Sequence, residues 1–219
     1  MKETIVWPTS RHQQLGEHIL AVCNANGLGL LLKGSIAAGI ARPFSDIDVS
    51  IYGSIDREII DEILYGIEMP LMISGSELPP GLLIVAYHRG LALDIGFKEN
   101  ESVDETGDSQ LLLKPPRCGA MSDSAKTYLQ TISRIDDYSK IVKLLHKGLL
   151  KYLNGKHDAA GNFLNEIAEF TGARIENQQN LTESFQAFIA TFLRKDDDMQ
   201  SEFSWLLEQA AIEDAHHFA

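Results

Sequence analysis

Apolar residues in the first half of the chain repeat with two different spacings. Between Ser10 and Asn26, and again between Asp56 and Ile67, they recur every three or four positions, which is typical of an amphipathic helix. Short apolar runs bounded by glycine and polar residues predict β-strands, at residues 28–32, 46–51, 82–87, 91–97 and 110–113. Helices that alternate with short strands in this way predict an α/β (α+β) fold, in which a mixed sheet carries its helices on one face.

The second half of the chain has a different character. Residues 98–116 are rich in acidic side chains and end in two prolines, so we expect a solvated linker there. Beyond it the apolar spacing is helical throughout, which predicts a four-helix bundle with segments at residues 122–154, 158–172, 181–195 and 200–215. We therefore expect two domains, an α/β domain at residues 1–114 and a helical bundle domain at residues 115–219.

Two aspartates, Asp46 and Asp48, lie two residues apart in the second apolar run. Since successive side chains of a strand point to opposite faces, both carboxylates share one face, while Ile47, Val49 and Ile51 share the other. Adjacent carboxylates repel each other unless a cation lies between them. Mg²⁺ prefers such oxygen ligands, together with waters and substrate phosphates. The pair therefore predicts a divalent metal site.

A Gly34-Ser35 pair ends the strand that precedes these aspartates. Gly34 lacks a Cβ atom, so a phosphate can approach the backbone closely. Ser35 is typical of a helix N-cap, and we expect it to begin a short helix at Ile36–Gly39 whose free N–H groups face an anion. Gly-Ser pairs are also common in ordinary turns, so the pair is informative only in combination with the aspartates.

A third aspartate, Asp94, lies in a later strand, where it shares a face with the small residues Ala92 and Gly96. If this strand lies beside the strand of Asp46 and Asp48, three carboxylates converge, which is enough to hold two cations for in-line phosphoryl transfer. Taken singly, each aspartate also fits a solvated turn or an ion pair. Their joint pattern favours the metal site.

The order of these features resembles the polymerase-β nucleotidyltransferase superfamily: a Gly-Ser turn, a pair of aspartates in an apolar strand, and an isolated aspartate in a later strand. The string GSIAAGIARPFSDIDVSIYG is similar to that of the aminoglycoside and related small-molecule nucleotidyltransferases, with Gly39, Pro43 and Ser45 also in place. The match spans Leu30 to Phe97. Many members carry a basic residue at the position that is Ala38 here.

This resemblance implies a nucleotidyltransferase catalytic domain with a two-ion magnesium site. Asp46 and Asp48 would hold the ion bound to the triphosphate of an NTP, and Asp94 would place the second ion near an acceptor hydroxyl. That hydroxyl would attack the α-phosphorus, displace pyrophosphate and leave a nucleoside monophosphate on the acceptor. Asp94 is also the candidate for accepting the hydroxyl proton.

The resemblance also implies which residues contact the nucleotide. These are Gly34, Ser35 and Ser45, with Arg42 as a nearby substitute for the basic side chain missing at Ala38.

Basic residues outnumber acidic ones between residues 126 and 156, although the protein as a whole is acidic. Related enzymes place a basic helical residue against the triphosphate, and Lys140 and Lys143 are the best candidates for that contact from the helical bundle. The alternative is a solvated lysine face, with Asp136 and Lys140 as an i,i+4 pair.

The formal net charge of −12 disfavours a nucleic-acid substrate, because such enzymes usually present a basic face. It suits a cationic small-molecule acceptor, although it also simply keeps a protein soluble. Two cysteines without metal spacing, no apolar run of membrane-spanning length and no signal peptide predict a cytoplasmic protein. A homodimer that shares its acceptor cleft is a further expectation from the superfamily.

Two functions from different classes follow. The first is an Mg²⁺-dependent nucleotidyltransferase that modifies a hydroxyl of an aminoglycoside-like acceptor. The second is a catalytically weak, nucleotidyltransferase-like binding or regulatory protein, such as an antitoxin-type partner of a helical protein. The three retained carboxylates favour the enzyme, and Ala38 weakly favours the binding protein. The sequence names neither the NTP nor the acceptor.

Overall fold

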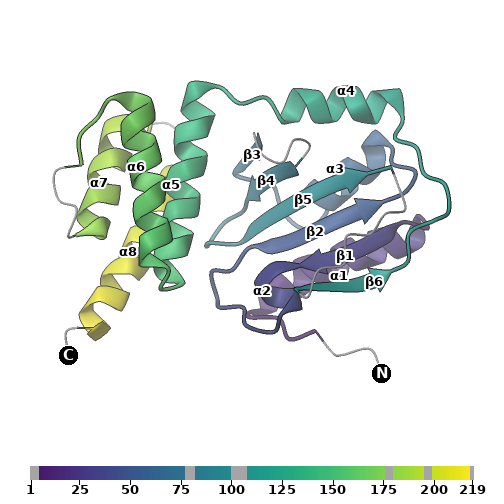
Figure 1. Ribbon diagram of the computed structural model, residues 1–219, viewed down its shortest axis with the longest axis horizontal. Helices are drawn as coiled ribbons and strands as arrows, with labels where there is room; N and C mark the ends of the chain where they lie inside the picture. Colours follow the sequence, from purple (N-terminus) through teal and green to yellow (C-terminus); the bar gives the residue numbers. More distant parts are fainter. Residues whose placement is uncertain (1–4, 77–81, 100–107, 176–179, 195–198, 218–219) are drawn as a thin grey trace. The chain divides into compact units, whose positions relative to one another are not determined.

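A computed structural model describes residues 5–76, 82–99, 108–175, 180–194 and 199–217 of the chain. They form two compact units, shown in Figure 1: Met1–Tyr87 with Leu91–Arg134, and His88–Gly90 with Ile135–Ala219. Much of the predicted acidic linker, residues 100–107, lies outside the described part of the chain.

The first unit contains a six-stranded mixed sheet within the described residues, with the strand order β3-β4-β5-β2-β1-β6. The strands β2 and β5 pair in parallel, and all other neighbours pair antiparallel. The strand bounds are β1 (Gly29–Lys33), β2 (Ile47–Tyr52), β3 (Met72–Gly75), β4 (Leu82–Ala86), β5 (Ala92–Lys98) and β6 (Ser109–Leu113). The predicted mixed sheet is confirmed, and β3 is an additional strand that the sequence pattern did not reveal.

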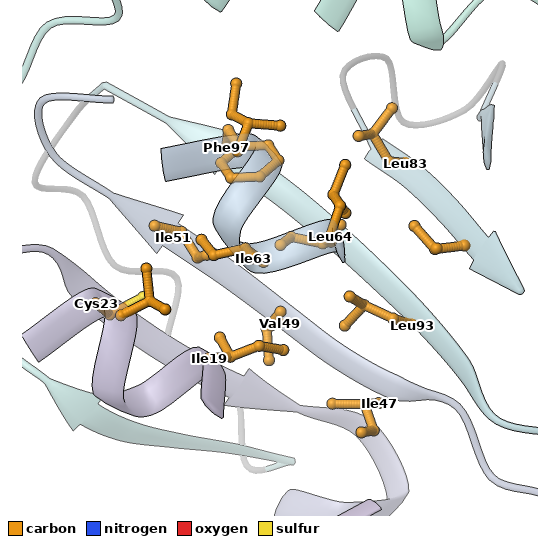
Figure 2. Close-up of a cluster of buried hydrophobic side chains, with 14 of the residues drawn as sticks. Ile19, Cys23, Ile47, Val49, Ile51, Ile63, Leu64, Leu83, Leu93 and Phe97 are labelled. Carbon is orange, nitrogen blue, oxygen red and sulfur yellow. The ribbon is translucent and has the colours of Figure 1, made fainter. Parts of the chain in front are cut away.

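The hydrophobic core lies between one face of this sheet and the helices α1 (Ser10–Ala25) and α3 (Arg57–Tyr65). Figure 2 shows Ile19 and Cys23 of α1 and Ile63 of α3 in one cluster with Val49 of β2 and Leu93 of β5. Alternate residues of β2 and β5 supply this apolar face, as the period of two in the sequence predicted. The opposite alternate positions are thereby left for polar side chains.

The helix α4 (Asp123–Ile132) belongs to the first unit. It packs on α3 and β3, and Tyr128 places its ring 4.6 Å from the guanidinium carbon of Arg57. The prediction of a single helix at residues 122–154 is wrong. The helix α4 ends at its C-cap, Ser133, and a capping box at Asp136 begins a new helix. The compact units therefore divide after Arg134, not at the boundary of 114 and 115 expected from the linker.

The second unit is a bundle of α5 (Asp137–Leu153), α6 (His157–Thr171), α7 (Leu181–Phe192) and α8 (Met199–His217). The helix α5 packs against the other three, and its apolar positions are buried. Residues 88–90 group with this unit because the Glu202 carboxylate accepts hydrogen bonds from the amides of Arg89 and Gly90, at 2.7 and 2.6 Å. None of the helices in the described part of the chain is long and apolar enough to cross a membrane.

The two cysteines should differ sharply in reactivity. Cys23 of α1 is fully buried in the core, and burial raises the pKa of its thiol to about 12, whereas Cys118 is exposed. Because the thiolate is the reactive form, we expect a thiol reagent at pH 8 to modify Cys118 rapidly and Cys23 only after unfolding in guanidinium. Mass spectrometry of the labelled peptides measures this, with Cys118→Ser as the control. Equal labelling rates at both positions in native protein would contradict the buried placement of Cys23.

Candidate metal centre

Three carboxylates converge on the face of the sheet opposite to the apolar core. The parallel pairing of β2 with β5 places Asp48 directly beside Asp94, and Asp46 lies two residues earlier on the same face. One carboxylate oxygen from each residue lies within 4.8 Å of the others. Asp46 and Asp94 are each 7% exposed, and Asp48 is half-buried. The predicted convergence of the three aspartates is confirmed.

This donor set fits a divalent cation. Three carboxylates at this separation repel one another, and a cation between them turns that repulsion into attraction. Oxygen donors of this kind suit hard ions such as Mg²⁺, and Asp48 is only half-buried, so water has access to this residue. Asp46, Asp48 and Asp94 are therefore the residues that could hold a metal.

A glycine turn lies directly against this cluster. Lys33, the last residue of β1, pairs with Asp48, and Gly34 follows with φ of +66°. A Cβ atom built on Gly34 would lie 2.4 Å from Oδ2 of Asp48. Any other residue at this position would therefore displace the Asp48 carboxylate. The turn and the metal site thus share one close contact.

The short helix after this turn begins earlier than expected. The helix α2 spans Gly34–Ala37 with Lys33 at its N-cap and no side-chain cap, so the predicted N-cap role of Ser35 is wrong. Ser35 lies in the first turn of α2 instead, because Gly34 already has helical hydrogen bonding, with its carbonyl accepting from the amide of Ala38 at 3.0 Å.

The loop that leads into β2 is closed by two hydrogen bonds. The backbone amide of Arg42 donates to Oγ of Ser45 at 2.9 Å, and the amide of Ser45 donates to the carbonyl of Arg42 at 2.9 Å. Ser45 is buried and Arg42 is exposed. The Ser45 hydroxyl, expected to contact the nucleotide, thus has a role in shaping the loop that positions Asp46.

A histidine that the sequence pattern did not single out also lies at this loop. His12 of α1 is 2% exposed, and its Nε2 lies 2.8 Å from the carbonyl oxygen of Ser45. Burial lowers the pKa of its imidazole, and the bond to Ser45 offsets part of that effect. No local signal could have found it, since the contact joins residues far apart in the sequence.

Lys140 and Lys143, the expected phosphate contacts, belong to the second unit. Nζ of Lys140 lies 4.7 Å from the centre of the Phe170 ring, a cation–π contact within the bundle. Lys143 is 7% exposed, which does not agree with the alternative of a fully solvated lysine face. Asp136 caps α5 by accepting a hydrogen bond from the amide of Ser139. A role for either lysine at the triphosphate stays a prediction.

Comparison with known proteins gives little similarity. No family model matches the chain, and no curated protein matches it. Among solved structures, it is similar to the crystal structure of a tRNA nucleotidyltransferase complexed with a primer tRNA and an incoming ATP analog, with 13% sequence identity and a TM-score of 0.28. The match covers 90% of this chain and 60% of that chain. The geometry of the three carboxylates, and not this distant likeness, supports the function proposed below.

Replacing Gly34 with alanine should displace Asp48 and weaken divalent-cation binding. Gly39 is the matched control, because it has a similar φ of +71° but no atom within 4 Å of an added Cβ. We expect Gly34→Ala to lower the affinity for Mn²⁺, measured by water-proton relaxation, at least about tenfold, and Gly39→Ala to leave it nearly unchanged. Equal losses in both variants would show that backbone strain, and not the contact with Asp48, controls binding.

Proposed function

We propose that this chain is a divalent-metal-dependent nucleotidyltransferase, which transfers a nucleoside monophosphate from an NTP to a hydroxyl of an acceptor and releases pyrophosphate. The observation that carries the proposal is the cluster of Asp46, Asp48 and Asp94. The cluster lies beside the Gly34 turn, in the order that resembles the polymerase-β superfamily. A carboxylate cluster and a glycine turn together suit a nucleoside triphosphate bound with its metal ions.

In the proposed reaction the acceptor oxygen forms a bond to the α-phosphorus. The bond from that phosphorus to the oxygen bridging the β-phosphate breaks, and pyrophosphate leaves with the electron pair. When bound, divalent ions neutralise negative charge on the phosphate group that is transferred. Asp46 and Asp48 would hold the ion of the triphosphate, and Asp94 would hold the second ion. Asp94 is also the candidate to accept the hydroxyl proton, directly or through water.

The nucleotide is proposed to contact the segment that follows β1. Gly34 is proposed to contact the phosphates through its backbone, because Asp48 occupies the space that a Gly34 side chain would fill. Ser35 offers a hydroxyl and a backbone amide in the first turn of α2. Arg42 is exposed on the following loop, and we propose it as a further contact to the phosphates. The loop contact of Ser45 makes it a supporting residue and not a direct ligand in this proposal.

We propose a small, cationic molecule as the acceptor, with the aminoglycoside class as the leading example. The chain carries a net charge of −12, and an acidic protein attracts a polyamine-like acceptor and repels a polyanion. The second candidate is a nucleotide-binding regulatory protein with little turnover. It is favoured by Ala38, which is exposed at the C-cap of α2 where many superfamily members have a basic residue.

Thermal stability with each of the four NTPs and Mg²⁺ tests the donor site. A ligand at about 100 times its Kd adds about 2.7 kcal/mol to the free energy of unfolding. For a protein of this size each kcal/mol raises Tm by about 2–4 °C, so we expect one NTP to raise Tm by several degrees. The shift should require Mg²⁺ and be lost in Asp46→Asn, which keeps the side-chain shape but removes the charge. Folded protein that responds to no NTP would contradict the nucleotidyltransferase proposal.

The acceptor class is tested by transfer of label from an α-³²P NTP, using the NTP that the thermal assay identifies. We expect labelled product and pyrophosphate with a panel of aminoglycosides and related polyamine alcohols, and no labelling of a tRNA or an oligonucleotide end. Asp94→Asn should abolish both products. Label on RNA would overturn the acceptor class alone, whereas NTP binding without transfer to any acceptor would favour the regulatory protein.

A further inference from the structure

The three carboxylates of the metal centre are positioned by different parts of the fold. Asp48 lies within the sheet between Lys33 of β1 and Asp94 of β5, and Asp94 lies between Asp48 and Ile84 of β4. Their backbones are therefore fixed on both sides by strand pairing. Asp46 precedes Ile47, the first residue of β2, so its position depends on the loop that enters the strand.

That loop is connected to α1 through His12. Its Nε2 lies 2.8 Å from the carbonyl oxygen of Ser45, and this carbonyl belongs to the peptide that joins Ser45 to Asp46. A carbonyl oxygen only accepts hydrogen bonds, so Nε2 carries the proton and donates it. The bond fixes the plane of the Ser45–Asp46 peptide, and with it the direction in which the Asp46 side chain leaves the backbone.

The other side of the ring is fixed by Thr9, the N-cap of α1. Nδ1 of His12 lies 2.7 Å from Oγ1 of Thr9, and that hydroxyl also accepts from the amide of His12 at 3.3 Å. In the neutral ring Nδ1 accepts, so the Thr9 hydroxyl donates to it. Thr9 thereby selects the tautomer in which Nε2 faces the Ser45 carbonyl with its proton. The chain of contacts runs from the start of α1 to the residue beside the metal ligand.

We propose that His12 is a positioning residue of the metal centre, which holds the Ser45–Asp46 peptide so that the Asp46 carboxylate meets those of Asp48 and Asp94. This inference rests on the proposed function, since it assigns His12 a role in metal binding at the same cluster. His12 acts through the backbone carbonyl and is not itself a metal ligand, because its Nε2 is engaged by Ser45 and its Nδ1 by Thr9.

The chain offers a matched control on the same helix. His18 also lies on α1, and its Nε2 also lies 2.8 Å from a backbone carbonyl, that of Glu62 at the end of α3. Both bonds join an imidazole nitrogen to a backbone carbonyl, although the His12 bond is buried and the His18 bond is exposed. The His18 bond joins α1 to α3 and not to the loop of Asp46. A purely structural role predicts that both histidines matter only for stability, whereas a positioning role predicts that only His12 affects the metal.

The test measures Mn²⁺ affinity by water-proton relaxation in full-length wild type, Asp46→Asn, His12→Ala, His12→Gln and His18→Ala, with Tm recorded for each. We expect Asp46→Asn to abolish binding and His12→Ala to weaken it about 10–100-fold, the range for loss of an outer-shell partner. His12→Gln retains an N–H donor near the position of Nε2 and should recover much of the affinity. His18→Ala should bind Mn²⁺ like the wild type even if its Tm falls.

The outcomes separate the two proposals. Wild-type protein that binds no Mn²⁺ would overturn the metal centre, and the role of His12 with it. Normal binding in wild type, loss in Asp46→Asn and unchanged affinity in folded His12→Ala would overturn the role of His12 alone. If His12→Ala does not fold, His12→Gln and Thr9→Val provide the comparison. In Thr9→Val the His12 ring loses the hydroxyl that selects its tautomer. Wild-type Mn²⁺ affinity in folded Thr9→Val would also overturn the role of His12.

Discussion

The parallel pairing of β2 with β5 is the interaction on which the candidate site depends. The two strands come from different parts of the sequence, and their register places Asp48 beside Asp94. A shift of one residue in that register would move one carboxylate to the apolar face. The core opposes such a shift, because Val49 and Ile95, the next pair along the strands, are both buried in it. Packing on one face of the sheet therefore fixes the chemistry on the other.

The same arrangement brings together groups that oppose folding. Three carboxylates within 4.8 Å repel one another, and Asp46 and Asp94 are nearly removed from solvent. A protein selected for stability alone would not place them there. The compensating stability comes from the continuous apolar cluster under the sheet, formed with α1 and α3 (Figure 2). A local loss of folding free energy that the surrounding structure offsets is typical of a functional site, and it agrees with a role in cation binding.

Sequence patterns predicted the parts of this arrangement that are local. The period of two in β2 and β5 assigned the aspartates to one face, and helical periods located α1 and α3. They did not predict β3 or the break before Asp136, because a short edge strand carries little periodicity and the Ser133 C-cap follows an apolar pattern that continues in α5. The contact of His12 with Ser45 depends on how α1 docks on the sheet, which no residue spacing expresses.

The structure also divides the motif residues into two kinds. Asp46, Asp48 and Asp94 present the carboxylates, whereas Gly34 and Ser45 control where those carboxylates lie, the first by leaving space for Asp48 and the second by closing the loop before Asp46. A motif read from sequence alone treats all five as ligand contacts. Their positions imply that substitutions at Gly34 or Ser45 act on the metal centre through geometry even where the nucleotide never touches their side chains. His12 of α1 is a further residue that controls carboxylate position, although it lies outside the motif, since it contacts the Ser45 carbonyl in the loop before Asp46.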